Sequence, residues 1–308
     1  MNVSFVDWNI TAYSVQDLRR VLGVRDIVFI CISTLVMLTN LVVMIAFITS
    51  YNLRERLANY FILNLSINDF ATGFLNATYY GSYPFRFMYG PLFWLILSST
   101  QSAVYTCSFV SMSLVSLDRY IYITSPLHYH LRVTAIRVKA AIILSWVIPI
   151  IIMMIIPNIV DLFYNVIEDP RHFNISTYVN IAGPIMVIIT VSTMLFTSVR
   201  ILFEARKQQR KINNQVMTTA TQVQSFKPAV EIRRLINTGV LVLVYLAMWL
   251  PYVIIAAAAI SRTMNYDMID VAGGFIFLNS CINPLLYAMN SDFKKAYLKI
   301  FYFIIRSP

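Results

Sequence analysis

The chain has 308 residues, of which 58% are hydrophobic and only 12% are charged, and its formal net charge is +10. Soluble domains carry about 25% charged residues, so this composition excludes a single soluble core and indicates a polytopic membrane protein. The three cysteines, Cys31, Cys107 and Cys281, all fall in apolar stretches, which excludes a disulfide framework or a zinc site in the loops.

The first residues, MNVSFVDWNITAYS, are polar and lack the basic-then-apolar order of a cleavable signal peptide. We therefore expect the first apolar run to direct membrane insertion. Runs long enough to cross a hydrocarbon core of about 30 Å are predicted as helices. They lie at 27–49, 57–80, 91–121, 140–156, 178–202, 235–260 and 268–289. The sequence thus predicts an all-α membrane protein, a seven-transmembrane helix bundle whose termini lie on opposite sides.

The distribution of Lys and Arg over the loops predicts the orientation, because cytoplasmic loops are enriched in these residues. With the N-terminus outside, most of the 24 basic residues fall on the cytoplasmic side. The outer side then receives only Arg19, Arg20, Arg25, Arg86, Arg171 and Arg262. The basic charge is explained by topology and by an acidic inner membrane leaflet, so nucleic-acid binding is not required.

Glycosylation sequons agree with this orientation. Asn2, Asn9 and Asn174 each begin an Asn-X-Ser/Thr triplet on the predicted outer side, and Asn76 begins another near the end of the second span. We expect the first three to be glycosylated, and a glycan on Asn76 is also compatible with the sequence.

The C-terminal segment SDFKKAYLKIFYFII has the pattern of a short amphipathic helix. Its apolar positions share one face and its lysines lie on the other, as in a helix lying on the inner membrane surface. The expected organisation is an extracellular N-terminus at 1–25, a seven-transmembrane domain at 26–290, and an amphipathic helix with a short cytoplasmic tail at 291–308.

Polar residues inside the spans are expected to face the bundle interior. Asp69 is the only acid deep within a predicted span, so it has to be paired, hydrated or protonated. Ser108, Asn279 and Asn283 supply oxygen atoms of the kind that hold a small hard cation such as sodium. A hydrogen-bonded network between spans, or a neutral Asp69, explains the same residues equally simply.

The third predicted span, FWLILSSTQSAVYTCSFVSMSLVSLDRY, is uncharged for most of its length and then ends in Asp118 and Arg119. A charge pair at a helix end avoids most of the cost of insertion and remains available to a partner. An ordinary interfacial anchor shows the same pattern.

Taken together, the motifs resemble the rhodopsin-like (class A) G-protein-coupled receptors over essentially the whole chain. Asn40, NLSIND with Asp69, LDRY followed by PLHY, Trp146, WLP and NPLLY occur in the family's order and at its spacings. The resemblance implies a multi-pass plasma-membrane receptor, not an enzyme, that binds an extracellular small-molecule ligand and activates a heterotrimeric G protein.

The resemblance also implies roles for individual residues. Arg119, held locally by Asp118 and followed by Tyr120, matches the arginine that pairs with an acid on span six, here Glu231, in the inactive state. Leu127 matches an apolar residue that docks into the G protein. The segment that repacks on activation is Asn283, Pro284 and Tyr287. The ligand pocket is expected at Gln101, Tyr105, Trp249, Tyr252 and Phe277. The family's allosteric sodium site maps to Asp69, Ser108, Asn279, Ser280 and Asn283.

Three departures from the family pattern alter these expectations. No cysteine occurs at the outer end of span three or in the second outer loop, so the usual disulfide between them cannot form. In span five, counting back from the inner end puts Thr190 at the usual proline position and Ser198 at that of a tyrosine that supports the active state, while Pro184, six residues earlier, offers a second register; either register loses a family tyrosine. Phe277 replaces the retinal-binding lysine of opsins, which excludes a retinal Schiff base.

The inner segments PLHY and FEARKQQRKI are similar to those of aminergic and adenosine receptors. Gln101, however, occupies the position of the aspartate that pairs with an amine, and a neutral amide does not compensate a buried cation. The sequence therefore favours a neutral or weakly polar ligand. The alternatives are an orphan, constitutively active or chemosensory receptor, and a transporter or channel, for which no inverted repeat is visible.

Overall fold

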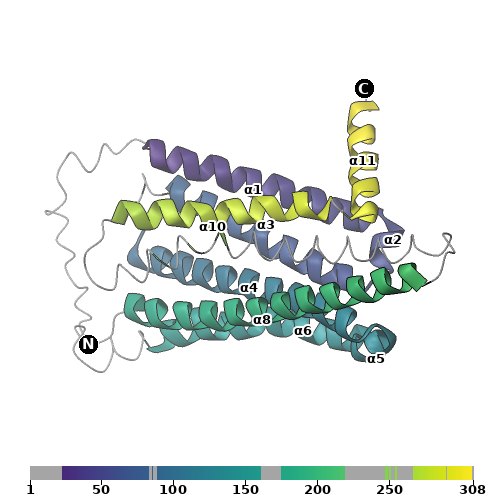
Figure 1. Ribbon diagram of the computed structural model, residues 1–308. Coiled ribbons are helices and arrows are strands. Elements are labelled where there is room, and N and C mark those ends of the chain that lie inside the picture. Colours follow the sequence, from purple (N-terminus) through teal and green to yellow (C-terminus); the bar gives the residue numbers. More distant parts are fainter. Residues whose placement is uncertain are drawn as a thin grey trace, which may run out of the picture.

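The computed structural model describes residues 23–82, 85, 89–160, 175–218, 247, 248, 250, 254, 266–288 and 290–306. Every regular element within these ranges is a helix, and the long helices lie side by side in a bundle (Figure 1). The first half contains α1 (Val24–Thr49), α2 (Tyr51–Arg54), α3 (Ala58–Ser82), α4 (Pro91–Thr124), η4 (Pro126–His128) and α5 (Tyr129–Arg132). The second half contains α6 (Ala135–Ile150), η5 (Ile151–Ile155), α8 (Ile175–Thr218), α10 (Tyr266–Tyr287) and α11 (Ser291–Arg306).

These helices confirm the predicted all-α bundle and six of its spans. The spans at 27–49, 57–80 and 91–121 correspond to α1, α3 and α4. The spans at 140–156, 178–202 and 268–289 correspond to α6 with η5, α8 and α10. The predicted sixth span, 235–260, lies outside the described residues except for residues 247, 248, 250 and 254.

Length and composition alone mark three stretches of the described chain as able to cross a membrane: Val24–Thr49, Ala135–Val160 and Ile185–Glu204. Helices α3, with 25 residues, and α4, with 34, are also long enough to cross a membrane but carry many polar residues. Most of these are buried, including Asn64, Asn68, Asp69 and Asn76 on α3 and Ser111 on α4. They face neighbouring helices rather than lipid, as expected for polar groups at bilayer depth.

Helices α1 and α3 approach closely at Gly73. A Cβ atom at this position would lie 2.8 Å from both the Ser33 carbonyl oxygen and Met37 Cγ of α1. Glycine is needed here for space, since a side chain would collide with the backbone of the neighbouring helix.

Proline 284 interrupts the hydrogen bonding of α10, and α1 compensates for it. A proline has no N–H to donate to the carbonyl four residues earlier, which here belongs to Ser280. The Nδ2 atom of the buried Asn40 donates to that carbonyl at 3.1 Å and also to the Val36 carbonyl at 3.0 Å. The first and last spans are thereby joined at the kink.

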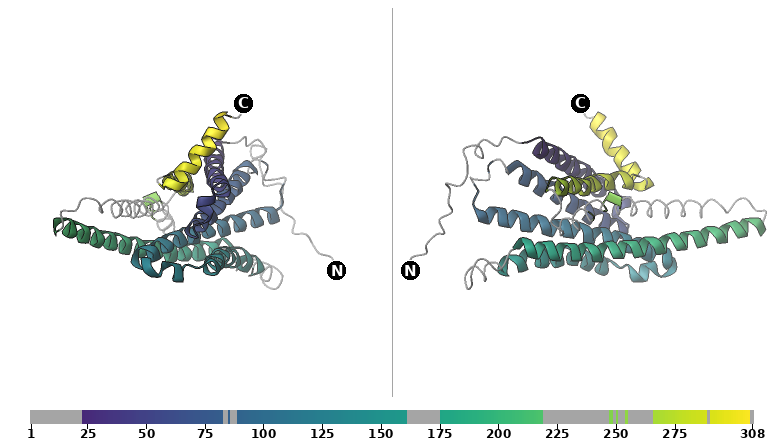
Figure 2. Two further views of the ribbon diagram at one scale, coloured as in Figure 1. Left: turned by 90° about the vertical axis from the view of Figure 1, so that its right-hand side faces the viewer. Right: turned by 60° about the vertical axis from the view of Figure 1, so that its left-hand side comes forward.

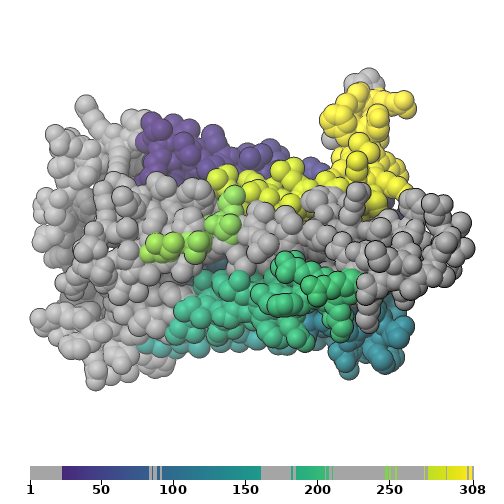
Figure 3. All heavy atoms as spheres, in the orientation of Figure 1, coloured from purple at the N-terminus to yellow at the C-terminus, as the bar shows by residue number. Residues whose placement is uncertain are grey.

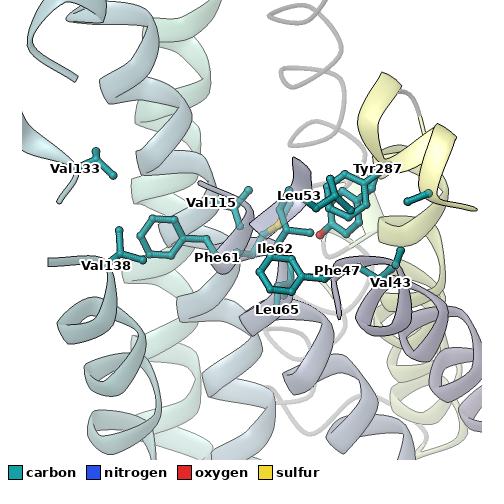
Figure 4. Close-up of a cluster of buried hydrophobic side chains, with 14 of the residues drawn as sticks. Val43, Phe47, Leu53, Phe61, Ile62, Leu65, Val115, Val133, Val138 and Tyr287 are labelled. Atoms are coloured by element: carbon teal, nitrogen blue, oxygen red, sulfur yellow. The ribbon is translucent and has the colours of Figure 1, made fainter. Parts of the chain in front are cut away.

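The largest buried apolar cluster joins most of the helices toward the end of the bundle that carries α11 (Figure 4). It is built from residues of α1, α2, α3, α4, α6, α8, α10 and α11, together with Val133, which follows α5. Among the members drawn are Val43, Phe47, Leu53, Phe61, Leu65, Val115 and Tyr287.

Helix α11 stands across the direction of the bundle and projects from its end (Figures 1 and 3). Its first turns are anchored: Phe293 is fully buried, Tyr297 OH donates to the Pro284 carbonyl at 3.3 Å, and Asp292 pairs with Arg56 at 2.8 Å. Phe301 and Phe303 near its far end are exposed. This confirms the predicted amphipathic helix and suits a segment lying along a membrane surface.

Helix α8 runs well past the ends of its neighbours (Figure 2). It has 44 residues, and about 20 suffice to cross the hydrocarbon core. The remaining turns carry Arg206, Lys207 and Arg210, on the side where the charge distribution places the cytoplasm.

Candidate functional site

The predicted ligand pocket contains a compact polar cluster between α3 and α4. Gln101 Nε2 donates to Asn76 Oδ1 at 2.6 Å and to Tyr105 OH at 2.9 Å, and Tyr105 OH donates to Asn76 Oδ1 at 2.5 Å. Asn76 is fully buried, whereas Gln101 is only partly buried. Gln101 and Tyr105, two of the predicted pocket residues, are thus joined through Asn76, which the sequence marks only as a possible glycosylation site.

An aromatic wall adjoins this cluster. The ring of Phe277 lies edge-on to Tyr105, with centroids 5.8 Å apart, and edge-on to Phe29 at the same distance. Phe29 in turn stacks on Tyr80 at 4.5 Å. These are favourable aromatic geometries, and they line the cluster with apolar surface. Trp249 and Tyr252, the other two predicted pocket residues, lie outside the described residues.

A second aromatic group occupies the outer ends of α3 and α4. Trp94 packs edge-on against Tyr79 at 5.7 Å, Phe93 at 5.3 Å and Tyr89 at 6.5 Å. Tyr79 contacts Tyr80, so this group is continuous with the wall of the pocket. All three cysteines of the chain are free, so no disulfide fastens this region.

Asp69 is the centre of a buried polar cluster below the pocket. Its Oδ1 accepts hydrogen bonds from Ser108 Oγ at 2.7 Å and Ser280 Oγ at 3.0 Å, and its Oδ2 accepts one from Asn283 Nδ2 at 3.1 Å. The residues come from α3, α4 and α10. Three donors compensate the cost of burying the carboxylate without a basic partner.

The donor set fits the sodium ion that the sequence resemblance implies. Asp69, Ser108 and Ser280 supply hard oxygen ligands, and Asn283 Oδ1 is buried with no hydrogen-bond partner among the described residues. Asn279 is also buried on α10, but no hydrogen bond joins it to Asp69 within the described part of the chain. Of the five residues predicted for the sodium site, Asp69, Ser108, Ser280 and Asn283 are therefore joined directly by hydrogen bonds.

Next to this cluster, amides and hydroxyls connect α3, α4 and α6. Asn64 Nδ2 donates to Ser111 Oγ at 2.8 Å and to Ser145 Oγ at 3.2 Å, and its Oδ1 accepts from Trp146 Nε1 at 2.8 Å. Asn68 Nδ2 donates to Ser111 Oγ at 2.7 Å. This network fixes the three helices relative to one another.

The end of α4 presents the predicted switch. Asp118 is buried and lies 3.9 Å from Arg119 Nε, while the Arg119 side chain remains 26% exposed. Tyr129 OH, from α5, donates to Asp118 Oδ1 at 2.7 Å. Burial, and secondly the charge of Asp118, raise the pKa of Tyr129 above its ordinary value, so its hydroxyl stays protonated.

Tyr120 and Leu127, two further residues of the predicted switch and G-protein contact, differ in how far they are buried. Tyr120 packs against the buried pair Ile123 and Ile201 and lies 5.9 Å from the Phe196 ring. Leu127, in contrast, is 89% exposed, so its apolar surface is open to a partner. Glu231, the predicted partner of Arg119, lies outside the described residues.

Tyr287 points into the apolar cluster and contacts Phe293, with ring centroids 5.8 Å apart. Its hydroxyl is buried and has no hydrogen-bond partner among the described residues. A buried unpaired hydroxyl is costly, so the side chain gains a hydrogen bond in any arrangement that brings it a partner.

In span five, the side-chain hydroxyls of Thr190 and Ser198 both donate hydrogen bonds to backbone carbonyls of α8. Ser198 is buried and its hydroxyl donates to the Met194 carbonyl at 2.5 Å, so it does not reach toward Arg119. Thr190 bonds back to the Met186 and Val187 carbonyls. A short contact of 2.5 Å between Ser116 and Thr197 ties α8 to α4 instead.

The glycosylation sites predicted at Asn2, Asn9 and Asn174 lie outside the described residues. The fourth sequon is incompatible with the structure, because Asn76 is fully buried and its Nδ2, the atom a glycan would occupy, donates to the Thr72 carbonyl at 2.9 Å. The sequence contained a signal for its true position: Asn76 follows Asp69 by seven residues, two helical turns, and so shares its inward face.

Comparisons with known proteins agree with this architecture. Residues 39–287 match the model of the "7 transmembrane receptor (rhodopsin family)". The chain is 27% identical over 302 residues to the histamine H2 receptor of Rattus norvegicus, covering 91% of this chain and 81% of that receptor.

Other receptors are similarly related. The 5-hydroxytryptamine receptor 6 of Mus musculus is 26% identical, with 82% of this chain and 65% of that receptor covered. Trace amine-associated receptor 6 of Mus musculus is 25% identical, with 85% and 80% covered. The chain therefore belongs to the rhodopsin family of seven-transmembrane receptors, and it is an integral membrane receptor rather than an enzyme.

Proposed function

We propose that this receptor binds a small extracellular molecule within the helix bundle and activates heterotrimeric G proteins at the plasma membrane. In this proposal Arg119 and Glu231 form the switch on the cytoplasmic side. The ligand contacts Gln101, Tyr105, Trp249, Tyr252 and Phe277.

The observation that carries the proposal is the continuity of α4. This single helix, Pro91–Thr124, holds Gln101 and Tyr105 near one end and Asp118 and Arg119 near the other. Gln101 and Arg119 are separated by about 27 Å along the helix at 1.5 Å per residue. The Asp69 cluster contacts the same helix between them, through Ser108. One element thus connects the partly buried polar cluster around Gln101 with a charged inner end.

The inner end has the features needed to receive a protein partner. Arg119 is partly exposed and Leu127 almost fully exposed, and the last turns of α8 add basic residues. Exposed apolar and arginine side chains of this kind are common anchors in protein interfaces. Opening of the bundle on this side would give a G-protein segment access to Arg119.

The named relatives recognise amines, but Gln101 argues against a conventional amine ligand for this chain. Its carboxamide carries no charge, and leaving an ammonium group unpaired in a buried site costs several kcal/mol. The site supports a neutral or weakly polar ligand held by hydrogen bonds to the amide and by aromatic contacts to Tyr105 and Phe277.

Further parts of the proposal follow the family resemblance. Sodium bound by Asp69, Ser108, Asn279, Ser280 and Asn283 acts as an allosteric modulator. Residues 1–25 are an extracellular segment glycosylated at Asn2 and Asn9, residues 26–290 form the receptor domain with a further glycan at Asn174, and residues 291–308 contact membrane lipid.

Basal signalling tests the switch without requiring a known ligand. G-protein activation is measured in cells that express wild type, Glu231→Ala or Arg119→Ala at matched surface levels. We expect the signal to rise with Glu231→Ala, because the arginine is released, and to vanish with Arg119→Ala. Normal surface expression without a signal from any variant would count against G-protein coupling through this pair, and a constitutive signal insensitive to both substitutions would indicate a different activation mechanism.

A further inference from the structure

The cluster of Asn76, Gln101 and Tyr105 has a particular pattern of donors and acceptors. Both N–H groups of Gln101 Nε2 are engaged, one with Asn76 Oδ1 and one with Tyr105 OH. The single O–H of Tyr105 is directed to Asn76 Oδ1, and Asn76 Nδ2 donates to the Thr72 carbonyl. A carboxamide has two N–H donors and a phenol has one, so the donors of Gln101 and Tyr105 are fully used.

What remains for a ligand is an acceptor. Gln101 Oε1 accepts no hydrogen bond within the described part of the chain, and Gln101, like Tyr105, is only partly buried. A ligand that meets this atom has to bring its own N–H or O–H donor. A ligand that presents only acceptors would leave the carboxamide oxygen and its own acceptor facing each other, which is unfavourable in a buried site.

The cluster also lacks charge. All three side chains are neutral, and Asp69 lies two helical turns from Asn76, about 10 Å along α3. Its two carboxylate oxygens already accept hydrogen bonds from Ser108, Ser280 and Asn283. A protonated amine placed against Gln101 would therefore lack a counter-charge within hydrogen-bonding distance among the described side chains.

Asn76 determines which end of the Gln101 carboxamide is presented. A glutamine side chain can rotate its terminal group by half a turn and exchange N–H for C=O at little cost. Because Asn76 Oδ1 is an acceptor held in place by burial, it binds the NH₂ end of Gln101 and leaves the oxygen outward. An acceptor on α3 thus fixes the specificity of a residue on α4.

From this arrangement we propose that Asn76 determines the ligand specificity of the receptor. By orienting Gln101, it selects a ligand that donates a hydrogen bond over a ligand of the same shape that only accepts one, while the neutrality of the cluster disfavours a protonated amine. This inference rests on the ligand site proposed above and adds the class of ligand and a positioning residue that contacts the ligand only through Gln101 and Tyr105.

The test uses two sets of probes that differ in the polar group: tryptophol against its methyl ether and against tryptamine, and 2-phenylethanol against its methyl ether and against 2-phenylethylamine. Their binding to purified full-length receptor is measured as the concentration dependence of the thermal-unfolding midpoint. The variants are Asn76→Asp, Asn76→Leu and Gln101→Glu. Gln208→Glu, in the part of α8 beyond the bundle, is the matched control for added negative charge.

We expect wild type and Gln208→Glu to favour the alcohols. Asn76→Asp keeps an oxygen that accepts from Gln101 and Tyr105 but adds a charge, so the preference should shift toward the amines by at least about tenfold, or 1.4 kcal/mol. Asn76→Leu should bring each alcohol and its methyl ether to similar affinity, because Gln101 is then free to present either end. A purely structural asparagine would weaken alcohol and ether equally and leave their ratio unchanged.

Gln101→Glu is a second acidic variant in case Asn76→Asp does not fold. It also tests the proposed ligand site independently of the role of Asn76. Amine binding gained by Gln101→Glu, together with an alcohol-to-ether ratio that Asn76→Leu leaves unchanged, with all proteins folded, would place the pocket correctly and overturn the role of Asn76. If neither acidic variant gains amine binding, the ligand site itself is wrong and the inference fails with it. These are binding measurements, so their outcome is independent of the Arg119 and Glu231 signalling experiment.

Discussion

Asn40 of α1 donates its side-chain amide to the Ser280 backbone carbonyl of α10 at 3.1 Å, at the carbonyl that Pro284 leaves without its usual helical partner. Two residues 240 positions apart in the sequence thereby satisfy a defect that the sequence of α10 creates. The contact places the first span against the most irregular part of the seventh.

Replacing Asn40 by Leu removes this compensation. The Ser280 carbonyl would remain buried without a donor, which costs about 1–3 kcal/mol. We expect a lower thermal-unfolding midpoint for the detergent-purified receptor. Thr39→Val is the matched control, because the Thr39 hydroxyl bonds only to carbonyls of its own helix, those of Leu35 and Val36; equal destabilisation by both variants would contradict the interpretation.

The close approach of α1 and α3 predicts opposite effects for two glycines of one helix. Gly73→Ala should destabilise the receptor by about 1–3 kcal/mol, the usual cost of overpacking, since its Cβ would meet the Ser33 carbonyl oxygen at 2.8 Å. Gly81→Ala should be neutral or slightly stabilising, because nothing lies within 4 Å of its added Cβ and alanine is the better helix former. The thermal-unfolding midpoints of the two variants are compared with that of wild type. An unchanged midpoint for Gly73→Ala would refute the packing argument.

If sodium binds at Asp69, sodium chloride should stabilise the wild-type receptor more than potassium chloride of equal ionic strength. Ligand linkage gives about 1.4 kcal/mol when sodium is at roughly ten times its Kd. Asp69→Asn should abolish the difference between the two salts. Asp292→Asn, which alters a carboxylate on α11, should retain it. Sodium sensitivity that persists in Asp69→Asn would remove this site from consideration.

The aromatic group around Trp94 is expected to hold the outer ends of α3 and α4 in place of a disulfide. Trp94→Ala should lower stability by up to about 3 kcal/mol, the low end for tryptophan truncation, whereas a reducing agent should have no effect because the three cysteines are free. Phe85→Ala, at an exposed ring in the same outer region, is the control. A receptor stabilised by oxidation, or unaffected by loss of Trp94, would contradict this view.

The sequence predicted those features that are tied to position along a helix. Asp69, Asp118 and Arg119 could be assigned because each lies in a motif with fixed spacing, and the spans follow from the length of apolar runs. Asn40 was recognised as an inward polar residue, although its partner could not be named, since the freed carbonyl belongs to a helix far along the chain.

Contacts made by side chains across helices were not predictable in the same way. The sequence allows a glycan on Asn76, because three residues suffice for a sequon, whereas the burial of Asn76 depends on the packing of α3 against α4. Tyr129 became a partner of Asp118 only through the fold of α5, which brings residues 11 positions apart together. The aromatic group at Trp94 likewise depends on rotamers and helix ends that a linear pattern does not specify.

The uninterrupted course of α4 has a mechanical consequence. A straight helix transmits force but stores little deformation, so pushing on its outer turns cannot by itself rearrange Arg119 some 27 Å away. In the proposed mechanism α4 is the fixed element of the receptor. A ligand at Gln101 would act by shifting the other helices around this fixed axis, and substitutions that loosen contacts between α4 and its neighbours should alter signalling more than those that alter α4 alone.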